Sequence, residues 1–265
     1  MSDVHANPKA LEVALADAHR LGCGKFILLG DVTGYGYDPK GALEIVRKNF
    51  DVVLMGNHDS ACTGLEPEWE VELNGNYDLD RQAREQLTED ERAWLRGLGY
   101  LHKGKGFVCT HGDFTQPKMW NYIFCGEAAG RNFAARAEGL MFCGHTHVAA
   151  IWEKAAKGGC RPKLERRFRS PAVRAESVSF KMNPESRYIV NVGSVGYPRN
   201  DLCCSYGIYD AATRRVTVRR LPFDFKSYIL AMLDRKIQLP TWLLQLLIAA
   251  QEHSHAVRPE WGWPS

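Results

Sequence analysis

Histidine, aspartate and asparagine recur just after short apolar runs in the first 150 residues of this 265-residue chain. The polar segments are residues 2–5, 30–31, 56–59, 110–112 and 144–147. A lone histidine at such a place is more often structural than a ligand, but five such segments in a chain with nine histidines are not expected by chance. The pattern predicts one metal-binding site assembled from several segments.

These side chains suit a pair of divalent cations. Two cations about 3.5 to 4 Å apart repel each other, so such a site needs a carboxylate that offers one oxygen to each. Asp31 is the natural bridge. The ligand set has oxygen and imidazole nitrogen but no thiolate, which favours Mn²⁺, Fe, Zn²⁺ or Co²⁺ over softer metals or Mg²⁺ alone. We expect two divalent metal ions, with Mn²⁺ as the leading candidate.

The elements that carry these segments are typical of an α/β domain. Asn7 before Pro8, and Asp38 before Pro39, are N-cap signals for two helices. Apolar runs at residues 25–29, 52–55, 106–109, 140–143 and 148–152 indicate buried strands. Ligands gather at the carboxyl edge of such a sheet, so we expect the polar segments to meet there.

A β-rich part follows, with strands expected at residues 178–180, 188–190, 205–209 and 216–220. Between the two parts, Thr88 and Glu91 form a capping box for a further helix. The tail contains two helical stretches broken by Pro240. We expect the metal-site domain over residues 1–222 and a C-terminal helical extension, packed on it, over residues 223–265.

The composition, 45% hydrophobic and 25% charged, allows a sizeable core. No apolar run reaches the roughly 18 to 20 residues of a membrane helix, and the N-terminus lacks a signal-peptide pattern. The eight cysteines are irregularly spaced and form no C-x-x-C pair, so we expect reduced thiols. These features predict a cytoplasmic protein with no membrane partner.

Positive charge is concentrated in residues 154–174, which hold eight Lys or Arg and one Glu in a chain of net charge +3. Such a run is usually a solvated loop, and we favour that interpretation. The alternative is a contact surface for nucleotide phosphates or nucleic acid. The residues that would make this contact are Arg161, Arg166, Arg167 and Arg169.

The ordered polar blocks resemble a known family. The blocks are Asp3-x-His5, Gly30-Asp31, Gly56-Asn57-His58-Asp59, His111-Gly112 and Gly144-His145-x-His147. Over residues 1 to about 222 they resemble the signature of the calcineurin-like metallophosphoesterase superfamily. The resemblance implies a four-layer α/β/β/α sandwich of two mixed sheets flanked by helices, and a metal-dependent phosphoric ester hydrolase.

The resemblance also implies roles for individual residues. Asp3, His5, Asp31 and His147 would hold one metal, and Asp31, Asn57, His111 and His145 the other. His58 would face the scissile phosphate as proton donor or transition-state stabiliser, oriented by Asp59. The two metals would polarise the phosphoryl oxygens while a hydroxide that bridges them attacks in line.

Departures from related patterns indicate a branch of the family. The second block lacks the arginine of the phosphoprotein phosphatases, and Tyr35 is one position too late for a purple acid phosphatase. The run Asn-Val-Gly-Ser-Val-Gly-Tyr-Pro-Arg at 191–199 is similar to the small prokaryotic phosphodiesterase/phosphatase branch, with Val192 in place of the usual Pro. In that branch Gly193, Ser194 and Arg199 would contact the substrate.

We expect hydrolysis of phosphodiesters or phosphomonoesters, with a phosphorylated small molecule or nucleotide as substrate. The alternative enzyme is a dinucleoside polyphosphate or nucleotide pyrophosphate hydrolase, in which the basic segment would hold the extra phosphates. A catalytically silent protein-binding scaffold is disfavoured, because every expected ligand is present together with His58. The apolar tail leaves a homo-oligomer open.

The first strand looks truncated. In this fold the Asp-x-His block ends a central strand, which needs about five apolar residues before the Asp, and the chain offers only Met1 and Ser2. Without that strand, Asp3 and His5 would lie on a fraying terminus. We expect an upstream in-frame segment of roughly five to eight residues rich in Val, Ile or Leu.

Overall fold

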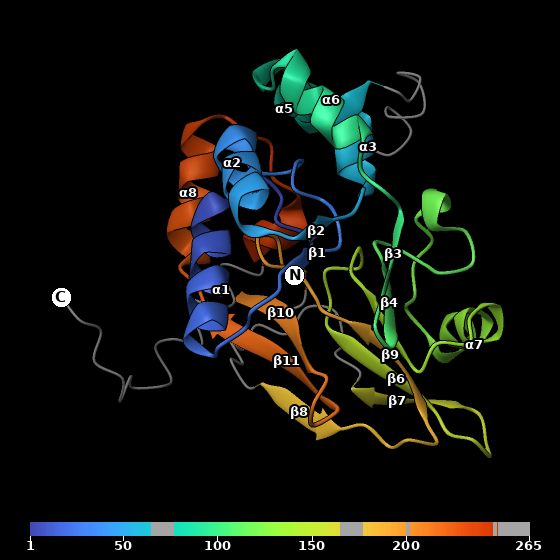
Figure 1. The fold of residues 1–265 in the computed structure, drawn as a ribbon. Coiled ribbons are helices and arrows are strands. Elements are labelled where there is room, and N and C mark those ends of the chain that lie inside the picture. The colour runs from blue at the N-terminus through green and yellow to red at the C-terminus, as the bar shows by residue number, and fades with distance from the viewer. Residues whose placement is uncertain (65–76, 165–176, 200–201, 246–247, 249–265) are drawn as a thin grey trace, which may run out of the picture.

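The computed structural model describes residues 1–64, 77–164, 177–199, 202–245 and 248. Two sheet layers pack face to face, with α1, α2 and α8 outside one of them and α7 outside the other (Figure 1). This is the expected four-layer α/β/β/α arrangement. The apolar residues between the sheets include Phe142 and Val190 from one layer and Phe180 and Val218 from the other.

The larger layer is a six-stranded mixed sheet in the order β3-β4-β5-β9-β6-β7. Its strands are β3 (Leu101–Gly104), β4 (Phe107–Thr110), β5 (Leu140–Cys143), β6 (Ala150–Lys154), β7 (Cys160–Leu164) and β9 (Arg187–Asn191). The central strands β4, β5 and β9 run parallel, so their carboxyl ends meet at one edge. β5 is buried at every residue, as a strand covered on both faces should be.

The second layer is built from two smaller sheets. β8 (Val178–Lys181), β10 (Cys203–Asp210) and β11 (Arg215–Pro222) form an antiparallel three-stranded sheet, and β1 (Ile27–Leu28) pairs in parallel with β2 (Val52–Val53). Residues 1–3 and 194–196 lie between them. The Leu29 amide donates to Met1 O, the Val195 amide to Ser2 O and the Ser205 amide to Ser194 O.

Residues 1–5 are therefore held on both sides by backbone hydrogen bonds. The side chains of Asp3 and His5 are fully buried rather than frayed. The amino group of Met1 donates to Ile27 O at 2.8 Å. Although the segment is not a regular strand, it takes the place of one between β1 and residues 194–196.

The two helices with Asn-Pro and Asp-Pro signals form as predicted. α1 (Pro8–Arg20) is capped by the side chain of Asn7, and α2 (Pro39–Asn49) by that of Asp38. Their apolar faces, with Leu11, Leu15 and Leu43 among the buried residues, pack on the second sheet layer. β1, the strand between them, is shorter than the predicted run at 25–29, because the chain turns at Gly30 and Asp31, which have positive φ.

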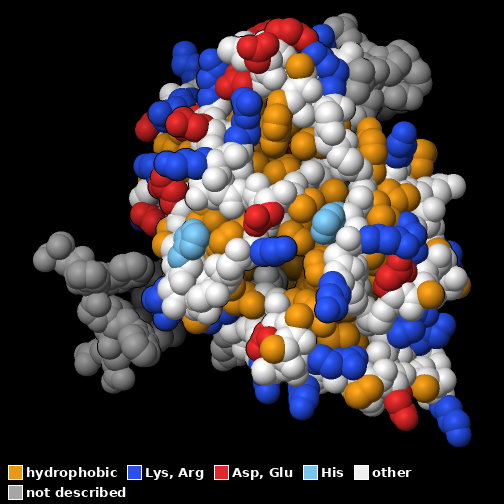
Figure 2. Space-filling model, in the orientation of Figure 1, with side chains coloured by type: hydrophobic (Ala, Val, Ile, Leu, Met, Phe, Trp, Pro, Cys, Tyr) orange, Lys and Arg blue, Asp and Glu red, His pale blue; other side chains and the backbone are white. Residues whose placement is uncertain are grey.

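A helical group lies at the top of Figure 1. It comprises α3 (Asn57–Thr63), α5 (Tyr77–Gln86) and α6 (Glu89–Arg96), and the predicted capping box of Thr88 and Glu91 opens α6. Acidic side chains gather at this end of the molecule in Figure 2, where the first turn of α6 carries three of them. After β4 follow the short 3-10 helix η1 (Pro117–Met119) and α7 (Gly126–Ala135).

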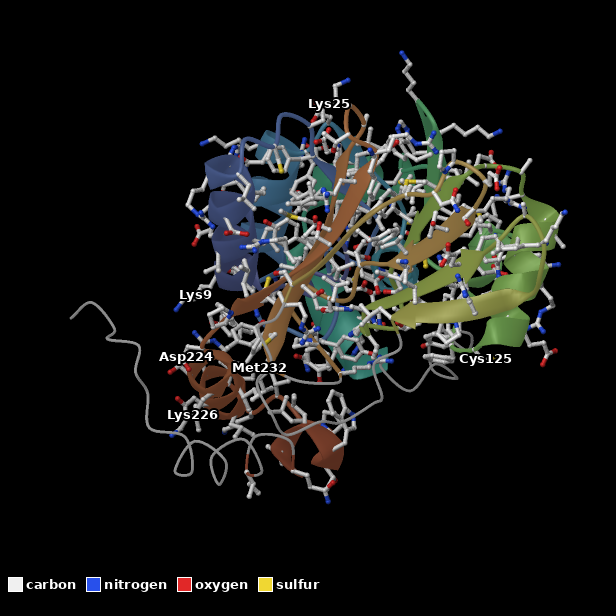
Figure 3. All side chains as sticks on the ribbon, turned by 90° about the horizontal axis from the view of Figure 1, so that it is seen from below. Lys9, Lys25, Cys125, Asp224, Lys226 and Met232 are labelled. Atoms are coloured by element: carbon white, nitrogen blue, oxygen red, sulfur yellow. The ribbon has the colours of Figure 1, made fainter. Side chains whose placement is uncertain are left out.

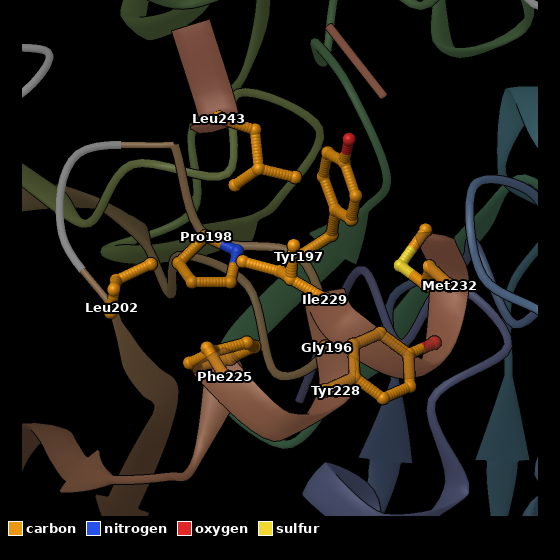
Figure 4. A pocket seen from close by; sticks show the side chains of 9 residues that line it. All are labelled: Gly196, Tyr197, Pro198, Leu202, Phe225, Tyr228, Ile229, Met232 and Leu243. Carbon is orange, nitrogen blue, oxygen red and sulfur yellow. The ribbon is translucent and has the colours of Figure 1, made fainter. Parts of the chain in front are cut away.

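The described part of the tail contacts the chain just before α1. α8 (Phe225–Asp234) begins beside the start of α1, as Asp224 and Lys9 show in Figure 3. The hydroxyl of Tyr228 donates to Ala6 O at 3.1 Å. With Leu243, α8 lines a small apolar pocket against residues 196–198 (Figure 4). Residues 249–265 lie outside the described part, so the extent of the C-terminal extension stays a prediction.

Two further observations bear on the composition. All eight cysteines are free thiols, and Cys109 and Cys143 are packed in apolar clusters. Of the helices in the described ranges, none combines the length and the apolar character needed to span a bilayer.

Candidate metal centre

The predicted metal ligands converge at one end of the sheets. Asp31 follows β1, Asn57 begins α3 after β2, His111 follows β4, and His145 and His147 follow β5, while Asp3 and His5 lie in the N-terminal segment. Ligand atoms of Asp3, His5, Asp31 and His147 lie within 4.8 Å of one another, and so do those of Asp31, His111 and His145. Asp31 belongs to both sets, as a bridging carboxylate must. With Asn57 added to the second set, we call these the first and second ligand groups.

In the first ligand group, two imidazoles point their nitrogens at each other. Nδ1 of His5 lies 3.0 Å from Thr33 O, and Nδ1 of His147 lies 2.6 Å from Tyr197 O. Each Nδ1 therefore donates to a carbonyl, which leaves a lone pair on Nε2 of the neutral ring. The two Nε2 atoms are only 3.0 Å apart, and Oδ1 of Asp3 lies 3.3 Å from Nε2 of His147. Such an arrangement fits a cation held by all three groups.

In the second ligand group, His111 is oriented in the same way. Its Nδ1 lies 3.1 Å from Leu29 O, so its Nε2 is the nitrogen that faces the site. That Nε2 is 3.2 Å from Oδ2 of Asp31 and 3.2 Å from Oδ1 of Asn57. The ring of His145 lies beside it, with centroids 4.9 Å apart. A proton or a cation must lie between these oxygens and the imidazole nitrogen.

Asp31 gives the clearest test of whether a metal fits. Its Oδ1 accepts the backbone N–H of His58 at 3.0 Å. Its Oδ2 is buried, yet among the described residues it receives no hydrogen bond of good geometry. Leaving a buried carboxylate oxygen without a partner is costly. The donor set, the opposed nitrogens and this oxygen all fit a pair of divalent cations.

Burial controls the protonation of the imidazoles. It lowers the pKa of His5, His145 and His147 well below the usual range, so these rings are neutral at neutral pH. Burial also disfavours the charged form of His111, but Asp31 outweighs it and raises the pKa of His111 to about 9. Burial raises the pKa of Asp3 to about 6. Three of the four rings are thus in the neutral form that binds metal.

The backbone of the ligand segments is strained. Asp3, His5, Asp31, His145 and His147 all have φ between +50° and +65°. This left-handed region is rarely used by residues other than glycine, and each such residue costs on the order of 1 to 3 kcal/mol. The conformation turns the side chains of these five residues toward a common centre.

His58 faces the centre from the start of α3. Its Nδ1 lies 2.7 Å from Oδ1 of Asp80 in α5, and both side chains are only 4% exposed. Burial acts to lower the pKa of His58, but Asp80, Tyr35 and Asp31 together raise it well above the usual value. A Cβ on Gly34, which has φ +81°, would lie 2.6 Å from Nδ1 of His58. Asp80 therefore favours the imidazolium form of His58. The missing side chain of Gly34 leaves room for the ring in this position.

Asp59 does not have the predicted role of orienting His58. Its Oδ1 accepts the backbone N–H groups of Val32 and Thr33, at 2.9 and 3.0 Å, and its Oδ2 accepts that of Gly56. Asp59 thus fixes the loop after β1, next to Asp31. The residue that contacts His58 is Asp80, which sequence reasoning missed because it lies 22 positions further on, in a polar helix.

Gly193 and Ser194 support the N-terminal segment rather than lining an open surface. The Ser194 hydroxyl donates to Asp3 O at 2.8 Å and accepts the Tyr197 amide at 2.8 Å. Gly193 has φ +74°, and a Cβ there would lie 2.8 Å from the hydroxyl of Ser205. Ser194 is fully buried. Their environment therefore indicates a structural role for Gly193 and Ser194, rather than the predicted contact with the substrate.

Arg199 lies at the edge of the centre. Its guanidinium donates to the hydroxyl of Tyr35 at 2.9 Å and also contacts Tyr122. Within the described ranges no carboxylate lies close enough to form an ion pair with Arg199. Its charge acts on His5 and His147, where it contributes to their lowered pKa. An uncompensated cation beside the centre is suited to a phosphate group.

Tyr122 is a second residue that the sequence did not indicate. Its ring stacks on the imidazole of His145, with centroids 4.0 Å apart and an angle of 12° between the planes. It comes from the loop between β4 and α7, whose sequence shows no motif. One face of the second ligand group is therefore covered by an aromatic ring.

The basic segment is only partly described. Arg161 and Lys163 lie on β7, and each pairs with Glu153 of β6, at 3.3 and 3.8 Å. Arg166, Arg167 and Arg169 lie outside the described residues. On the face shown in Figure 2, Lys and Arg side chains are spread over the lower half of the molecule. The described part of the segment is thus a solvated edge strand with a partly neutralised charge.

Comparisons with known proteins agree with this geometry. A family model for the calcineurin-like phosphoesterase superfamily domain matches residues 1–214. A metallophosphoesterase from Sphaerobacter thermophilus is similar with a TM-score of 0.74 and 29% identity, over 94% of this chain and 98% of that one. A hypothetical protein from Pyrococcus horikoshii has the same fold, with a TM-score of 0.68 and 15% identity over 90% and 92%. An uncharacterised protein of Methanocaldococcus jannaschii is 25% identical over 250 residues, 92% of this chain and 93% of that protein.

The family match spans the whole region that supplies the converging side chains. It runs from the N-terminal segment through β10 and includes both ligand groups and His58. The fold of the Sphaerobacter protein extends over nearly the full length of both chains. The chain belongs to the calcineurin-like phosphoesterase superfamily.

Proposed function

We propose that this protein hydrolyses phosphoric esters with two divalent metal ions held by the first and second ligand groups. The observation that carries the proposal is the pair of Nε2 atoms of His5 and His147, 3.0 Å apart with their lone pairs opposed. A neutral imidazole pair at this distance is repulsive unless a cation lies against both rings. The family supports phosphoester hydrolysis as the chemistry of such a site.

When bound, two such ions supply Lewis-acid chemistry, polarising phosphoryl oxygens and lowering the pKa of an attacking water. His58 would then donate a proton to the leaving oxygen or neutralise its developing charge. Asp80 holds the ring of His58 through Nδ1, which leaves Nε2 for the substrate. Arg199 would bind a non-bridging phosphate oxygen at the edge of the centre.

Mn²⁺ is the ion we propose for both positions. The ligand set consists of carboxylate oxygens, one amide oxygen and imidazole nitrogens. The described cysteines nearest in sequence, Cys109 and Cys143, are packed in apolar clusters and supply no thiolate. An N/O set of this kind suits Mn²⁺, Zn²⁺ or iron and disfavours soft metals.

The substrate we propose is a simple phosphodiester or phosphomonoester. Hydrolysis of a pyrophosphate bond would need additional cations for the further phosphates. Arg161 and Lys163 of the basic segment are already paired with Glu153. Arg199, by contrast, has no carboxylate partner among the described residues.

Turnover of bis(p-nitrophenyl) phosphate by metal-free protein reconstituted with Mn²⁺ tests the proposal. We expect hydrolysis that depends on Mn²⁺ and is lost in the matched variant Asp31→Asn. The same assay with p-nitrophenyl phosphate separates diesterase from monoesterase activity. A protein that binds two metal ions and hydrolyses neither ester would be a scaffold, and the proposal would be wrong.

A further inference from the structure

The helix α8 lies beyond the part of the chain that the family model matches. The match ends at residue 214, whereas α8 begins at Phe225. The buried face of α8 nevertheless shares an apolar cluster with Tyr35 and Tyr197, two residues that pack beside the first ligand group. The members of that cluster that α8 supplies are Phe225, Tyr228, Ile229 and Met232. An element outside the family match is thus part of the surroundings of the proposed metal centre.

The hydroxyl of Tyr228 holds the chain directly after His5. It donates to Ala6 O at 3.1 Å, and the amide of Asp38 donates to the same oxygen at 3.2 Å. His5 and Ala6 both have a φ of +50°, a conformation that persists only where the surroundings enforce it. A Cβ on Gly36 would collide with the Tyr228 hydroxyl and with His5 O, so this contact is close. The hydroxyl therefore helps to fix the backbone that carries the imidazole of His5.

The aromatic rings of the cluster reach both imidazoles of the first ligand group. Tyr35 packs edge-on against His5, with centroids 4.6 Å apart, and stacks on Tyr197 at 4.4 Å and 11°. Tyr197 O lies 2.6 Å from Nδ1 of His147. Tyr197 also lines the apolar pocket that α8 and Leu243 form (Figure 4). His5 and His147 are therefore both held by residues that share a cluster with α8.

The residues that belong to the second ligand group alone have other supports. Nδ1 of His111 lies 3.1 Å from Leu29 O, and the ring of His145 is stacked by Tyr122. Leu29 belongs to the apolar cluster between the sheets, and Tyr122 comes from the loop before α7. A change in α8 should therefore affect the two ligand groups unequally.

We propose that α8 is part of the support of the first ligand group, with Tyr228 as a positioning residue for His5. The hydroxyl holds the strained backbone at His5 before an ion binds, so that the ion does not have to impose this conformation. The affinity of the first ligand group for its ion then depends on a hydrogen bond from beyond the region that the family model matches. The inference rests on the metal centre of the proposed function and is independent of which ester is hydrolysed.

Tyr228→Phe removes the hydroxyl and keeps the ring. Metal-free wild type and variant are titrated with Mn²⁺ in a calorimeter, and Asp3→Asn identifies which of the two affinities belongs to the first ligand group. We expect Tyr228→Phe to weaken binding at that position by roughly 2- to 10-fold, the effect of one hydrogen bond. The affinity of the other position should stay unchanged.

Hydrogen exchange of the backbone amides gives a second readout, independent of activity. In the metal-free protein, residues 3–7 should exchange faster in Tyr228→Phe than in the wild type, because the backbone after His5 loses a hydrogen bond. Coupling between two sites is reciprocal, so Mn²⁺ should slow the exchange of α8 in the wild type. In the variant, Mn²⁺ should slow it less.

Tyr206→Phe is the matched control. The hydroxyl of Tyr206 donates to Asp17 of α1 at 2.6 Å, and the residue is 1% exposed. This variant also loses one hydrogen bond of a buried tyrosine, but the partner is not next to a ligand residue. We expect a loss of Tm comparable to that of Tyr228→Phe, with both Mn²⁺ affinities as in the wild type.

Three results would overturn the inference. Wild-type affinities in Tyr228→Phe, with two ions bound, would show that α8 does not support the centre and would leave the proposed function intact. If both positions weakened equally, or if Tyr206→Phe had the same effect, the hydroxyl would contribute to general stability only. A wild type that binds no Mn²⁺ would remove the metal centre, and with it the proposed function and this inference.

Discussion

The two ligand groups share Asp31 but differ in charge and in burial. The first group adds Asp3, His5 and His147, so it has two carboxylates, and its side chains are at most 2% exposed. The second group adds Asn57, His111 and His145 and has only one carboxylate. Asn57 is partly exposed, and His145 lies under the exposed ring of Tyr122. The first group thus carries more negative charge and is more completely buried than the second.

The groups also differ in backbone strain. In the first, Asp3, His5 and His147 all have left-handed φ, as does the shared Asp31. Among the residues that belong to the second group alone, this holds for His145 only. A strained backbone around a buried pair of carboxylates is stabilised by a bound cation. We therefore expect the first group to bind its ion more tightly than the second.

Replacing the shared residue should have the largest effect, because it breaks both groups. Asp31→Asn keeps an Oδ1 acceptor for the backbone of His58 but removes the bridging charge. We expect turnover to be abolished. Loss of a residue that only supports a metal ligand lowers metal affinity by about 10- to 100-fold, and we expect a larger loss here. Circular dichroism should show an unchanged fold. Mn²⁺-stimulated turnover in this variant would contradict the assignment.

His58→Ala should leave both ligand groups intact and slow the chemistry. We expect kcat to fall by roughly 10²- to 10⁴-fold, the range for one lost acid–base group, with two ions still bound. Asp80→Asn should lower kcat by less, with little change in KM, because the ring of His58 remains but loses its carboxylate partner. Asp59→Asn is the comparison that separates the two carboxylates. If Asp59→Asn reduced kcat and Asp80→Asn did not, Asp80 would not be the carboxylate that orients His58.

Charge exchange between the groups sharpens the comparison. Asp3→Asn removes a carboxylate from the first group, and we expect the affinity for the tighter ion to fall by more than the roughly 10- to 100-fold that loss of an outer contact costs. Asn57→Asp adds a carboxylate to the second group and should strengthen the weaker ion. Calorimetric titration with Mn²⁺ measures both. If Asp3→Asn lowered the affinity of both positions for Mn²⁺ equally, Asp3 would not belong to the first ligand group alone, as the distances indicate.

Metal removal should abolish turnover under the proposed mechanism, and its effect on stability should be the smallest of the expected effects. An ion present at about 1,000 times its Kd stabilises the fold by roughly 4 kcal/mol, which for a chain of this size shifts Tm by on the order of 10 °C. We expect chelation to lower Tm by that order in the wild type and by much less in Asp31→Asn. Calorimetric scans with and without chelator make the measurement. A Tm that does not respond to chelation would speak against strain relieved by the ions.

Much of the fold could be predicted, because local signals and tertiary contacts agree. The Asn7 and Asp38 caps fix the starts of α1 and α2, and the run at 140–143 forms β5 with the expected bounds. Asp31, His111, His145 and His147 stood out because each follows a strand, whereas Asp3 and His5 lie in an N-terminal segment without a regular strand. β1 and β2 are both shorter than expected, and after β1 the chain turns at Gly30 and Asp31.

The residues that sequence reasoning missed share a physical reason. Asp80 and Tyr122 come from a polar helix and an irregular loop, where no periodicity marks the side chain that meets the centre. Asp59 has the right type and spacing, but its carboxylate accepts backbone N–H groups of the neighbouring loop instead. Ser194 likewise binds the backbone beside it. Such choices depend on which donors the tertiary fold brings near.

The central claim is a dinuclear centre with one tight and one weaker position, and metal titration tests it most directly. Metal-free wild type titrated with Mn²⁺, with bound metal measured by mass spectrometry, should bind two ions per chain with unequal affinities. Asp3→Asn should reduce the affinity of the tighter ion. One ion per chain, or none, in the wild type would contradict the account.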